Sequence, residues 1–317
     1  RETRFDPYPI AIWNRDSGAD IQLASPAVTR AVAQTDYVSP EPITSPDGRY
    51  ILFDSTNFVY IWDTANLTGE SPYVPTSIHE IDDGTLLYID GDTSMSTGSL
   101  EAALRAVGGV VLAVDEVVGK KVANAFVATR PPGHHAESVR PMGFCLFNNV
   151  AVAARYAQKT HGLARVGIVD FDVHHGNGTE NIVAGDERML MVSIFQHPFY
   201  PYSGDKPLAD NLCNVPLPAG TRGEAFREAV STRWLPRLQE FAPQMLFISA
   251  GFDAHYEDDM ASLGLVEADY AWVTTQLLKF AQVHCQGRIV SMLEGGYALS
   301  ALGRSVTEHV RALAELG

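Results

Sequence analysis

The sequence lacks several features that define whole classes of protein. It has only three cysteines, which are widely spaced, and no CxxC pair. This argues against a disulfide framework or a thiolate zinc site, and it fits a reducing compartment. No apolar run approaches the roughly 20 residues of a membrane-spanning helix, and the N-terminal residues lack the basic-then-apolar pattern of a signal peptide. We therefore expect a cytoplasmic protein with no membrane partner.

Positive charge is also scarce. The chain has 23 Lys and Arg residues against 38 Asp and Glu residues, which gives a formal net charge of −15. Because phosphate binding requires a cationic face, we expect no direct nucleic-acid partner. A negative field favours cationic substrates such as lysine side chains or polyamines, although many proteins are acidic for solubility alone.

From about residue 86 onward the sequence alternates between strand-like and helix-like segments. Short apolar runs, typical of strands buried on both faces, lie at 123–129, 165–170, 189–195, 245–249 and 289–293. Segments with a helical spacing of apolar residues lie at 100–118, 150–158, 224–241, 268–283 and 302–316. This alternation predicts an α/β fold with a mostly parallel central sheet and helices on both faces.

The first 84 residues have a different character. They contain many prolines and show no helical periodicity. Apolar stretches at 50–53 and 58–62 flank the polar turn 54–57, which is a β-hairpin pattern. We therefore divide the chain into an atypical N-terminal segment, 1–84, and a larger α/β domain, 85–317.

The stretch DFDVHHGNG, at 170–178, directly follows a predicted buried strand. Carboxylates and imidazoles rarely crowd such a position without a function, because burying unpaired charge is costly. Asp172 and His174 are two residues apart, so in extended backbone their side chains point the same way. A carboxylate and an imidazole on one side suit a zinc ion. For an isolated DxH, a polar loop that caps a helix is the alternative.

Three further motifs follow predicted strands in the same way. A Pro/Gly loop carries His134 and His135, and adjacent histidines suit acid–base work because they titrate near neutral pH. Asp253, in SAGFD, offers a second carboxylate ligand, with a helix N-cap as the alternative. Tyr297, in LEGGY, offers a hydroxyl that can donate to an oxyanion, with a plain turn as the alternative.

All four motifs lie at the carboxyl ends of predicted parallel strands, the edge at which open α/β sheets build their sites. Asp172, His174 and Asp253 supply three metal ligands and leave one position open, which is the pattern of a catalytic zinc. With a histidine pair and a tyrosine donor, this inventory predicts metal-assisted amide hydrolysis.

Taken together, four motifs closely resemble the histone deacetylase superfamily: RPPGHHAESVRPMGFCLFNN, VDFDVHHGNGTE, SAGFDAH and LEGGY. The match is best with its class II-like bacterial members, the histone deacetylase-like amidohydrolases, and covers about residues 85–317. The resemblance implies an arginase/deacetylase-like fold and a deacetylase catalytic domain over that range. It also implies zinc-dependent hydrolysis of N-acetyl or short-chain acyl lysine-like substrates, which releases acetate and a free amine.

The resemblance implies a catalytic role for each matching residue. The three metal ligands named above would bind Zn²⁺. His135 would be the general base and His134 its partner, oriented by Asp170. Asn177 falls where the polar partner of the second histidine is expected. Tyr297 would polarise the substrate carbonyl.

The resemblance also implies how the substrate and a second ion are held. The carbonyl of Gly143 would accept the substrate amide proton, and Phe144 and Tyr200 would wall the channel around an aliphatic side chain. Family members hold a structural K⁺ near the zinc, which here would involve Asp170, Asp172, His174, Ser193 and Ile194.

Two departures from the family pattern concern the rim of the site. Residues 1–84 contain no His-Pro-Glu type motif, which puts substrate selection and activity in question. After Asp253, the acidic run 257–259 and Met260 stand where relatives carry Asp-Pro-Leu. Polyamine-specific members place a glutamate near the position of Met260, which argues against a dedicated polyamine deacetylase. The acidic run either attracts cationic substrates or forms a solvated loop.

Other functions stay open at this point. The chain could be an acetylpolyamine or other small acetylated-amine amidohydrolase, or a catalytically impaired acyl-lysine-binding protein. An arginase-type ureohydrolase shares the fold but needs two manganese ions and extra aspartates, which DVHHGNG does not offer. Homo-oligomerisation also stays open.

Overall fold

The computed structural model describes residues 86–314 in full. Of the remaining residues, it describes only the backbone of five short strands. These are β1 (Ala11–Trp13), β2 (Asp20–Gln22), β3 (Ile43–Thr44), β4 (Tyr50–Ser55) and β5 (Phe58–Asp63). β1 and β2 pair antiparallel, and β3, β4 and β5 form an antiparallel sheet in that order. The predicted hairpin falls on β4 and β5, where Ser55 pairs with Phe58.

The chain divides into two compact units. One consists of residues 1–87 and 95–101, and the other of residues 88–94 and 102–317. Two short strands, β6 (Leu87–Tyr88) and β7 (Ser94–Met95), lie at the first two of the three points in the sequence where the chain passes from one unit to the other. All of the predicted site residues belong to the larger unit.

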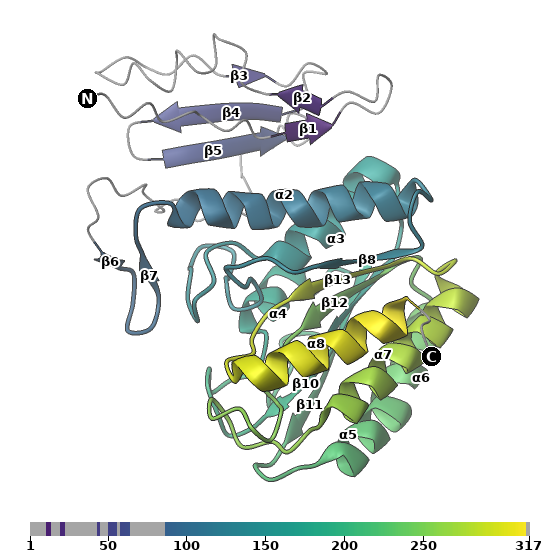
Figure 1. The fold of residues 1–317 in the computed structure, drawn as a ribbon. Helices are drawn as coiled ribbons and strands as arrows, with labels where there is room; N and C mark the ends of the chain where they lie inside the picture. Colours follow the sequence, from purple (N-terminus) through teal and green to yellow (C-terminus); the bar gives the residue numbers. More distant parts are fainter. Residues whose placement is uncertain are drawn as a thin grey trace. The chain divides into compact units, whose positions relative to one another are not determined.

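The larger unit is built on a six-stranded sheet in which every neighbouring pair is parallel (Figure 1). The strand order is β11-β10-β9-β12-β13-β8. The strands are β8 (Asn124–Val127), β9 (Val166–Asp170), β10 (Met189–Gln196), β11 (Leu212–Leu217), β12 (Leu246–Ala250) and β13 (Ile289–Leu293). This confirms the predicted α/β fold with a parallel central sheet.

Helices cover both faces of this sheet. They are α2 (Ser99–Val118), α3 (Asn149–His161), α4 (Asn177–Val183), α5 (Gly223–Ala229), α6 (Leu235–Phe241), α7 (Glu267–His284) and α8 (Leu299–Leu313), with a π-helical turn, η2 (Val230–Trp234), between α5 and α6. One apolar cluster joins the sheet to α5–α8, and a second joins it to α2, α3 and α4. Side chains alternate along each strand, so Ile168 lies in the second cluster and Val169 in the first.

The sheet register places the predicted motifs side by side. Asp170, at the end of β9, pairs with Ser193 of β10 on one side and with Ser249 of β12 on the other. The loops that follow β8, β9, β12 and β13 therefore leave the sheet at the same edge, where the backbone must place their polar side chains close together. Among the described residues, no helix is long and apolar enough to cross a membrane.

Candidate active site

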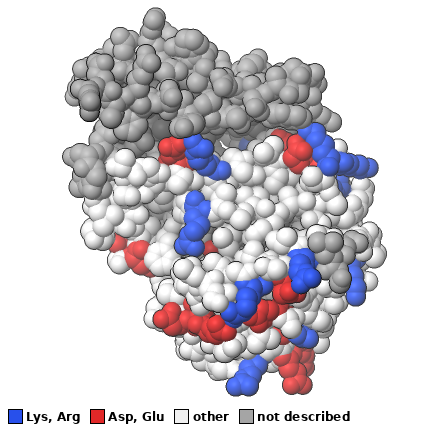
Figure 2. Space-filling view, in the orientation of Figure 1, with Lys and Arg blue, Asp and Glu red and all other residues white. Residues whose placement is uncertain are grey.

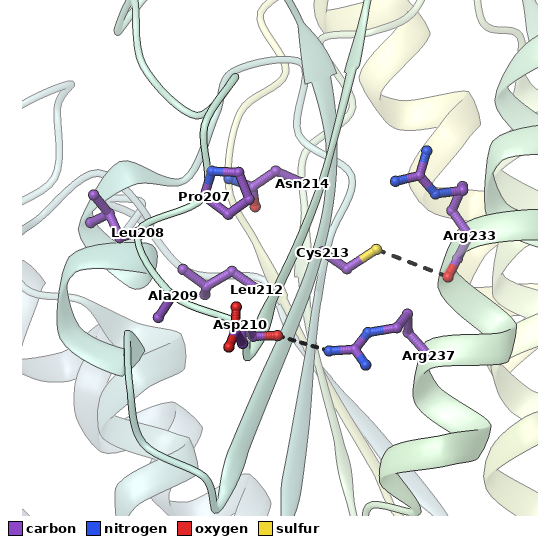
Figure 3. Close-up of a pocket in the computed structure, with 9 residues that line it drawn as sticks. All are labelled: Pro207, Leu208, Ala209, Asp210, Leu212, Cys213, Asn214, Arg233 and Arg237. Atoms are coloured by element: carbon purple, nitrogen blue, oxygen red, sulfur yellow. Dashed lines mark hydrogen bonds between the residues drawn. The ribbon is translucent and has the colours of Figure 1, made fainter.

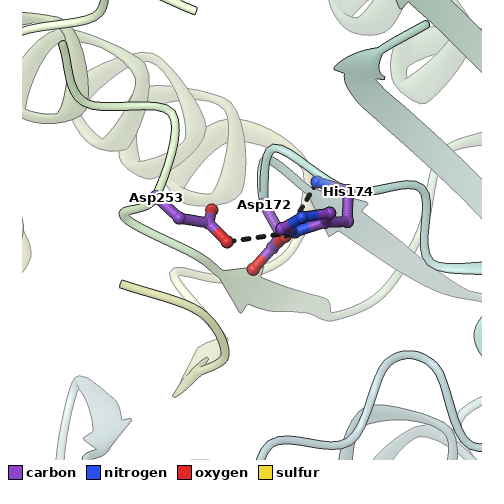
Figure 4. Close-up of side chains that lie close together, drawn as sticks. All are labelled: Asp172, His174 and Asp253. Carbon is purple, nitrogen blue, oxygen red and sulfur yellow. Dashed lines mark hydrogen bonds and ion pairs between the residues drawn. The ribbon is translucent and has the colours of Figure 1, made fainter. Parts of the chain in front are cut away.

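Three ligand-type side chains converge at the carboxyl edge of the sheet (Figure 4). Asp172 and His174 lie in the loop after β9, and Asp253 lies in the loop after β12. The Nδ1 atom of His174 is 3.0 Å from Asp172 Oδ1 and 3.1 Å from Asp253 Oδ2. Ligand atoms about 2.1 Å from a tetrahedral zinc lie about 3.4 Å apart. The three buried side chains therefore have the atoms, the charge and the spacing for one zinc-sized cation.

The second oxygen of each aspartate is held by the backbone. Asp172 Oδ2 accepts the N–H of Gly295 at 2.8 Å, and Asp253 Oδ1 accepts the N–H of Val173 at 3.0 Å. A Cβ at Gly295 would overlap carboxylate oxygens of both aspartates, and one at Gly251 would overlap the carboxylate of Asp172. The carboxylates are therefore oriented by bonds on one side and by close backbone on the other.

The two histidines of the Pro/Gly loop have different partners. His134 Nδ1 lies 3.0 Å from Asp170 Oδ2, and His135 Nδ1 lies 2.8 Å from Asn177 Oδ1. Asn177 Nδ2 donates to Glu137 Oε1 at 2.7 Å, which fixes the amide with its oxygen toward His135. His135 must then carry its proton on Nδ1, so its Nε2 lone pair is left to accept a proton.

The surroundings give the two imidazoles opposite protonation. Burial, together with positive charge on His134, holds the pKa of His135 well below its usual value. Burial alone would also lower the pKa of His134, but the carboxylates of Asp172 and Asp170 outweigh it and raise that pKa well above its usual value. The site thus combines a neutral imidazole that can accept a proton with a cationic one that can donate.

Aromatic side chains surround this group. The ring of Tyr200 lies 5.2 Å from that of His135, and the ring of Tyr297 lies 6.0 Å from that of Phe144. Burial and nearby carboxylates raise the pKa of Tyr297, so its hydroxyl stays a neutral donor. The carbonyl oxygen of Gly143 accepts a hydrogen bond from the thiol of Cys145 at 3.3 Å and keeps a second lone pair that can accept another.

The residues predicted for K⁺ lie at the junction of β9 and β10. Asp170 pairs with Ser193 across the two strands, and Ile194 follows directly. Both β10 residues are buried, and the Ser193 hydroxyl has no hydrogen-bond partner among the residues that the structure describes. Buried hydroxyls are rarely left without a partner, so this one is available to a water or an ion.

Three further residues contact the site, and none of them was predicted from the sequence to have a role there. Glu294 is fully buried, and its carboxylate accepts the backbone N–H groups of Gly133 at 2.6 Å and His134 at 3.1 Å. Its signal was an acidic residue directly after a buried strand. Asp92 accepts the N–H of Gly143, and Phe199 stacks on His174 with ring centres 5.6 Å apart. Neither of these two lies in a motif that points to it.

Away from the predicted site, a hollow lies at the sheet edge formed by β11 (Figure 3). It has a volume of about 460 Å³, and its lining includes Cys213, Arg233 and Arg237 but none of the predicted site residues. On the face shown in Figure 2, basic and acidic side chains are interspersed rather than gathered into one basic field.

Comparison with known proteins identifies the family. The histone deacetylase domain matches residues 47–313. The chain is 41% identical to type-2 histone deacetylase 2 of Dictyostelium discoideum over 71% of its own length and 14% of that protein. It is 36% identical to the histone deacetylase-like amidohydrolase of Pseudomonas aeruginosa over 65% of its own length and 56% of that protein.

A solved structure agrees with the sequence comparison. The crystal structure of the HDA15 HD domain matches 73% of this chain and 67% of that one, with 35% identity and a TM-score of 0.69. The chain therefore belongs to the histone deacetylase family, a family of deacetylase hydrolases. The match begins at residue 47, inside the segment that composition sets apart.

Proposed function

We propose that this protein is a zinc-dependent deacylase that acts on N-acetyl or short-chain acyl lysine-like amines. Hydrolysis breaks the amide C–N bond, adds the hydroxyl of water to the acyl carbon and a proton to the nitrogen, and gives a carboxylate and a free amine. The observation that carries the proposal is the buried Asp172–His174–Asp253 group beside a neutral imidazole with a free Nε2. Membership of the histone deacetylase family supports it.

Asp172, His174 and Asp253 would hold the Zn²⁺. When bound, the ion supplies Lewis-acid chemistry that polarises the acyl carbonyl and lowers the pKa of water. His135 Nε2 takes a proton from the attacking water, since its Nδ1–H is committed to Asn177.

Two other groups act on the charge that develops in the reaction. The Tyr297 hydroxyl donates to the developing oxyanion, because its raised pKa keeps the proton in place. His134, held as a cation by the carboxylates around it, supplies the positive charge and the proton that the departing amine nitrogen needs. The acid and the base are thus adjacent residues of one rigid loop.

The predicted channel and potassium site extend the proposal. Phe144, which is 38% exposed, and Tyr200 would sheath the aliphatic part of the substrate, and the Gly143 carbonyl would accept its amide proton. The unpartnered Ser193 hydroxyl beside Asp170 supports the structural K⁺.

The proposal also covers the range of the catalytic domain and the compartment in which the protein acts. We place the deacetylase catalytic domain at 85–317, after an atypical segment at 1–84. The three cysteines are free and buried, which suits a reducing cytoplasm.

Turnover of a short acetyl-lysine fluorogenic peptide tests the proposal. We expect activity that is lost on chelation and regained with zinc, with one zinc per chain by elemental analysis. Tyr297→Phe should lower kcat by about 10²–10³-fold, the usual loss for one oxyanion donor. A folded, zinc-loaded protein that binds a hydroxamate without turnover would instead be an acyl-lysine-binding protein. Turnover of free acetylated polyamines in preference to peptides would favour the small-amine alternative.

A further inference from the structure

The acidic run 257–259 does not behave as a single charged patch. Glu257 and Asp259 are exposed, whereas Asp258 between them is only 5% exposed. Glu257 pairs with Arg304 on the surface. The sequence treats these three carboxylates alike, but the structure gives Asp258 an interior role.

The buried carboxylate of Asp258 binds the backbone on both sides of a turn. Its Oδ2 accepts the N–H of Tyr297 at 2.7 Å and the N–H of Ala298 at 2.9 Å. Its Oδ1 accepts the N–H of Met260 at 3.1 Å, which fixes the carboxylate in its own loop. The loop after β12 is thereby joined to the backbone that carries the predicted oxyanion donor.

The backbone at Tyr297 needs such an anchor. Two glycines precede it, and Gly296 has φ +137°, a conformation that favours glycine. Because glycine restricts the backbone least, these residues do little to fix the position of Tyr297. Ala298, the N-cap of α8, provides no side-chain cap of its own in the described structure. Asp258 therefore accepts N–H groups that nothing local would satisfy, and its charge favours a helix N-terminus.

We propose that Asp258 is a positioning residue for deacylation, which fixes the Tyr297 backbone so that the hydroxyl points into the site. The inference rests on the proposed function, because Tyr297 acts there as the oxyanion donor. It differs from attraction of cationic substrates by the acidic run, which would depend on charge alone and would involve all three carboxylates.

Asp259→Asn is the matched control, since it removes the same charge from the exposed neighbour. We expect Asp258→Ala to lower kcat about 10–100-fold with KM within about twofold, because a small misplacement of a reacting group has effects of that size. Asp258→Asn should recover part of the loss, since its oxygen can still accept from Tyr297. Asp259→Asn should leave both constants within about twofold. Equal rises in KM for both asparagine variants would overturn the proposal in favour of charge attraction.

A double-mutant cycle tests whether Asp258 acts through the tyrosine. In a Tyr297→Phe background there is no hydroxyl left to position, so Asp258→Ala should change kcat by less than about threefold. A loss as large as in the wild-type background would show that Asp258 acts elsewhere, and would overturn the proposal.

Amide hydrogen exchange keeps the test independent of turnover. The amides of Tyr297 and Ala298 should lose protection in Asp258→Ala and retain it in Asp259→Asn. If the wild type shows no deacylation, the proposed function fails, while lost protection still supports the anchor and unchanged protection overturns it. Should Asp258→Ala fail to fold, Asp258→Asn is used for both measurements.

Discussion

At the scale of single residues, the site depends on one amide that can face only one way. Asn177 offers its oxygen to His135 because its nitrogen is engaged by Glu137. The partly exposed carboxylate of Glu137, by orienting the Asn177 amide, thus decides which nitrogen of the buried His135 imidazole carries the proton. The sequence pointed to Asn177 by resemblance, but it held no sign of the part played by Glu137.

Removing the Asn177 amide should leave the tautomer of His135 unfixed. In Asn177→Ala, His135 Nδ1 loses its acceptor, so the imidazole can hold its proton on either nitrogen. We expect kcat to fall about 10–100-fold, within the usual contribution of a general base, while KM changes little. Steady-state kinetics on the acetyl-lysine peptide check this. An unchanged kcat would show that Asn177 does not set the tautomer.

At the scale of elements, long periodic segments are predictable and polar ones are not. The strands β8, β9, β10, β12 and β13 lie where apolar runs placed them. β11 was missed because it contains Asn214 and Pro216, residues that weaken a strand signal. Proline is tolerated there because β11 is the edge strand and the Pro216 ring faces solvent.

The helices show a similar limit. The buried side of α2 carries Val110, Val114 and Val117, whereas Val107 and Val111, which also contribute to the apolar spacing of this segment, are only half-buried. Small residues supply the rest of that face, and a count of large apolar residues overlooks them. The helix predicted at 224–241 is interrupted by η2, a π-helical turn that periodicity does not encode.

A buried histidine connects three elements and should make the fold sensitive to acid. His309 of α8 contacts the hydroxyls of Thr274 on α7 and Ser291 on β13. Burial lowers its pKa to about 3. Below the unfolded pKa of about 6.5 the unfolded chain therefore takes up a proton that the folded chain does not, so stability falls as the pH drops from 6.5 toward 3.

The size of this effect follows from the two pKa values. Between pH 7 and pH 5 this one group should lower the free energy of unfolding by about 2 kcal/mol, at up to about 1.4 kcal/mol per pH unit. His309→Gln does not titrate and should lose that much less over the same interval. Urea unfolding at the two pH values measures the difference, and parallel losses in both proteins would contradict it.

At the scale of the whole molecule, the residues that stabilise the sheet and the residues of the candidate site occupy different parts of it. Two apolar clusters fill both faces, while the polar groups of the site gather at one edge. That separation is why the fold, and the convergence of Asp172, His174 and Asp253 at one edge, could be predicted from strand ends and spacing. Contacts such as Asp92 with Gly143 depend on loop paths that no local pattern fixes.

Removing a bound metal ion should therefore lower the stability of the entire larger unit. Without a cation, burial and the neighbouring carboxylate of Asp172 disfavour the charged form of Asp253 and raise its pKa to about 6. An ion present at 1,000 times its Kd adds about 4 kcal/mol to stability. We expect the melting temperature to rise with zinc and to fall with chelator. Asp253→Asn should respond much less, and an equal response would place the stabilising metal elsewhere.

Gly251 and Gly295 give the site a further property. Bare backbone approaches the carboxylates closely, with no room for a methyl group beside Asp172 at Gly251 or beside Asp172 and Asp253 at Gly295. The placement of the two candidate ligands is therefore under steric control from two positions that are not themselves candidate ligands. A single added carbon at either one would displace at least one of these carboxylates, so the proposed metal site can be altered without touching a candidate ligand.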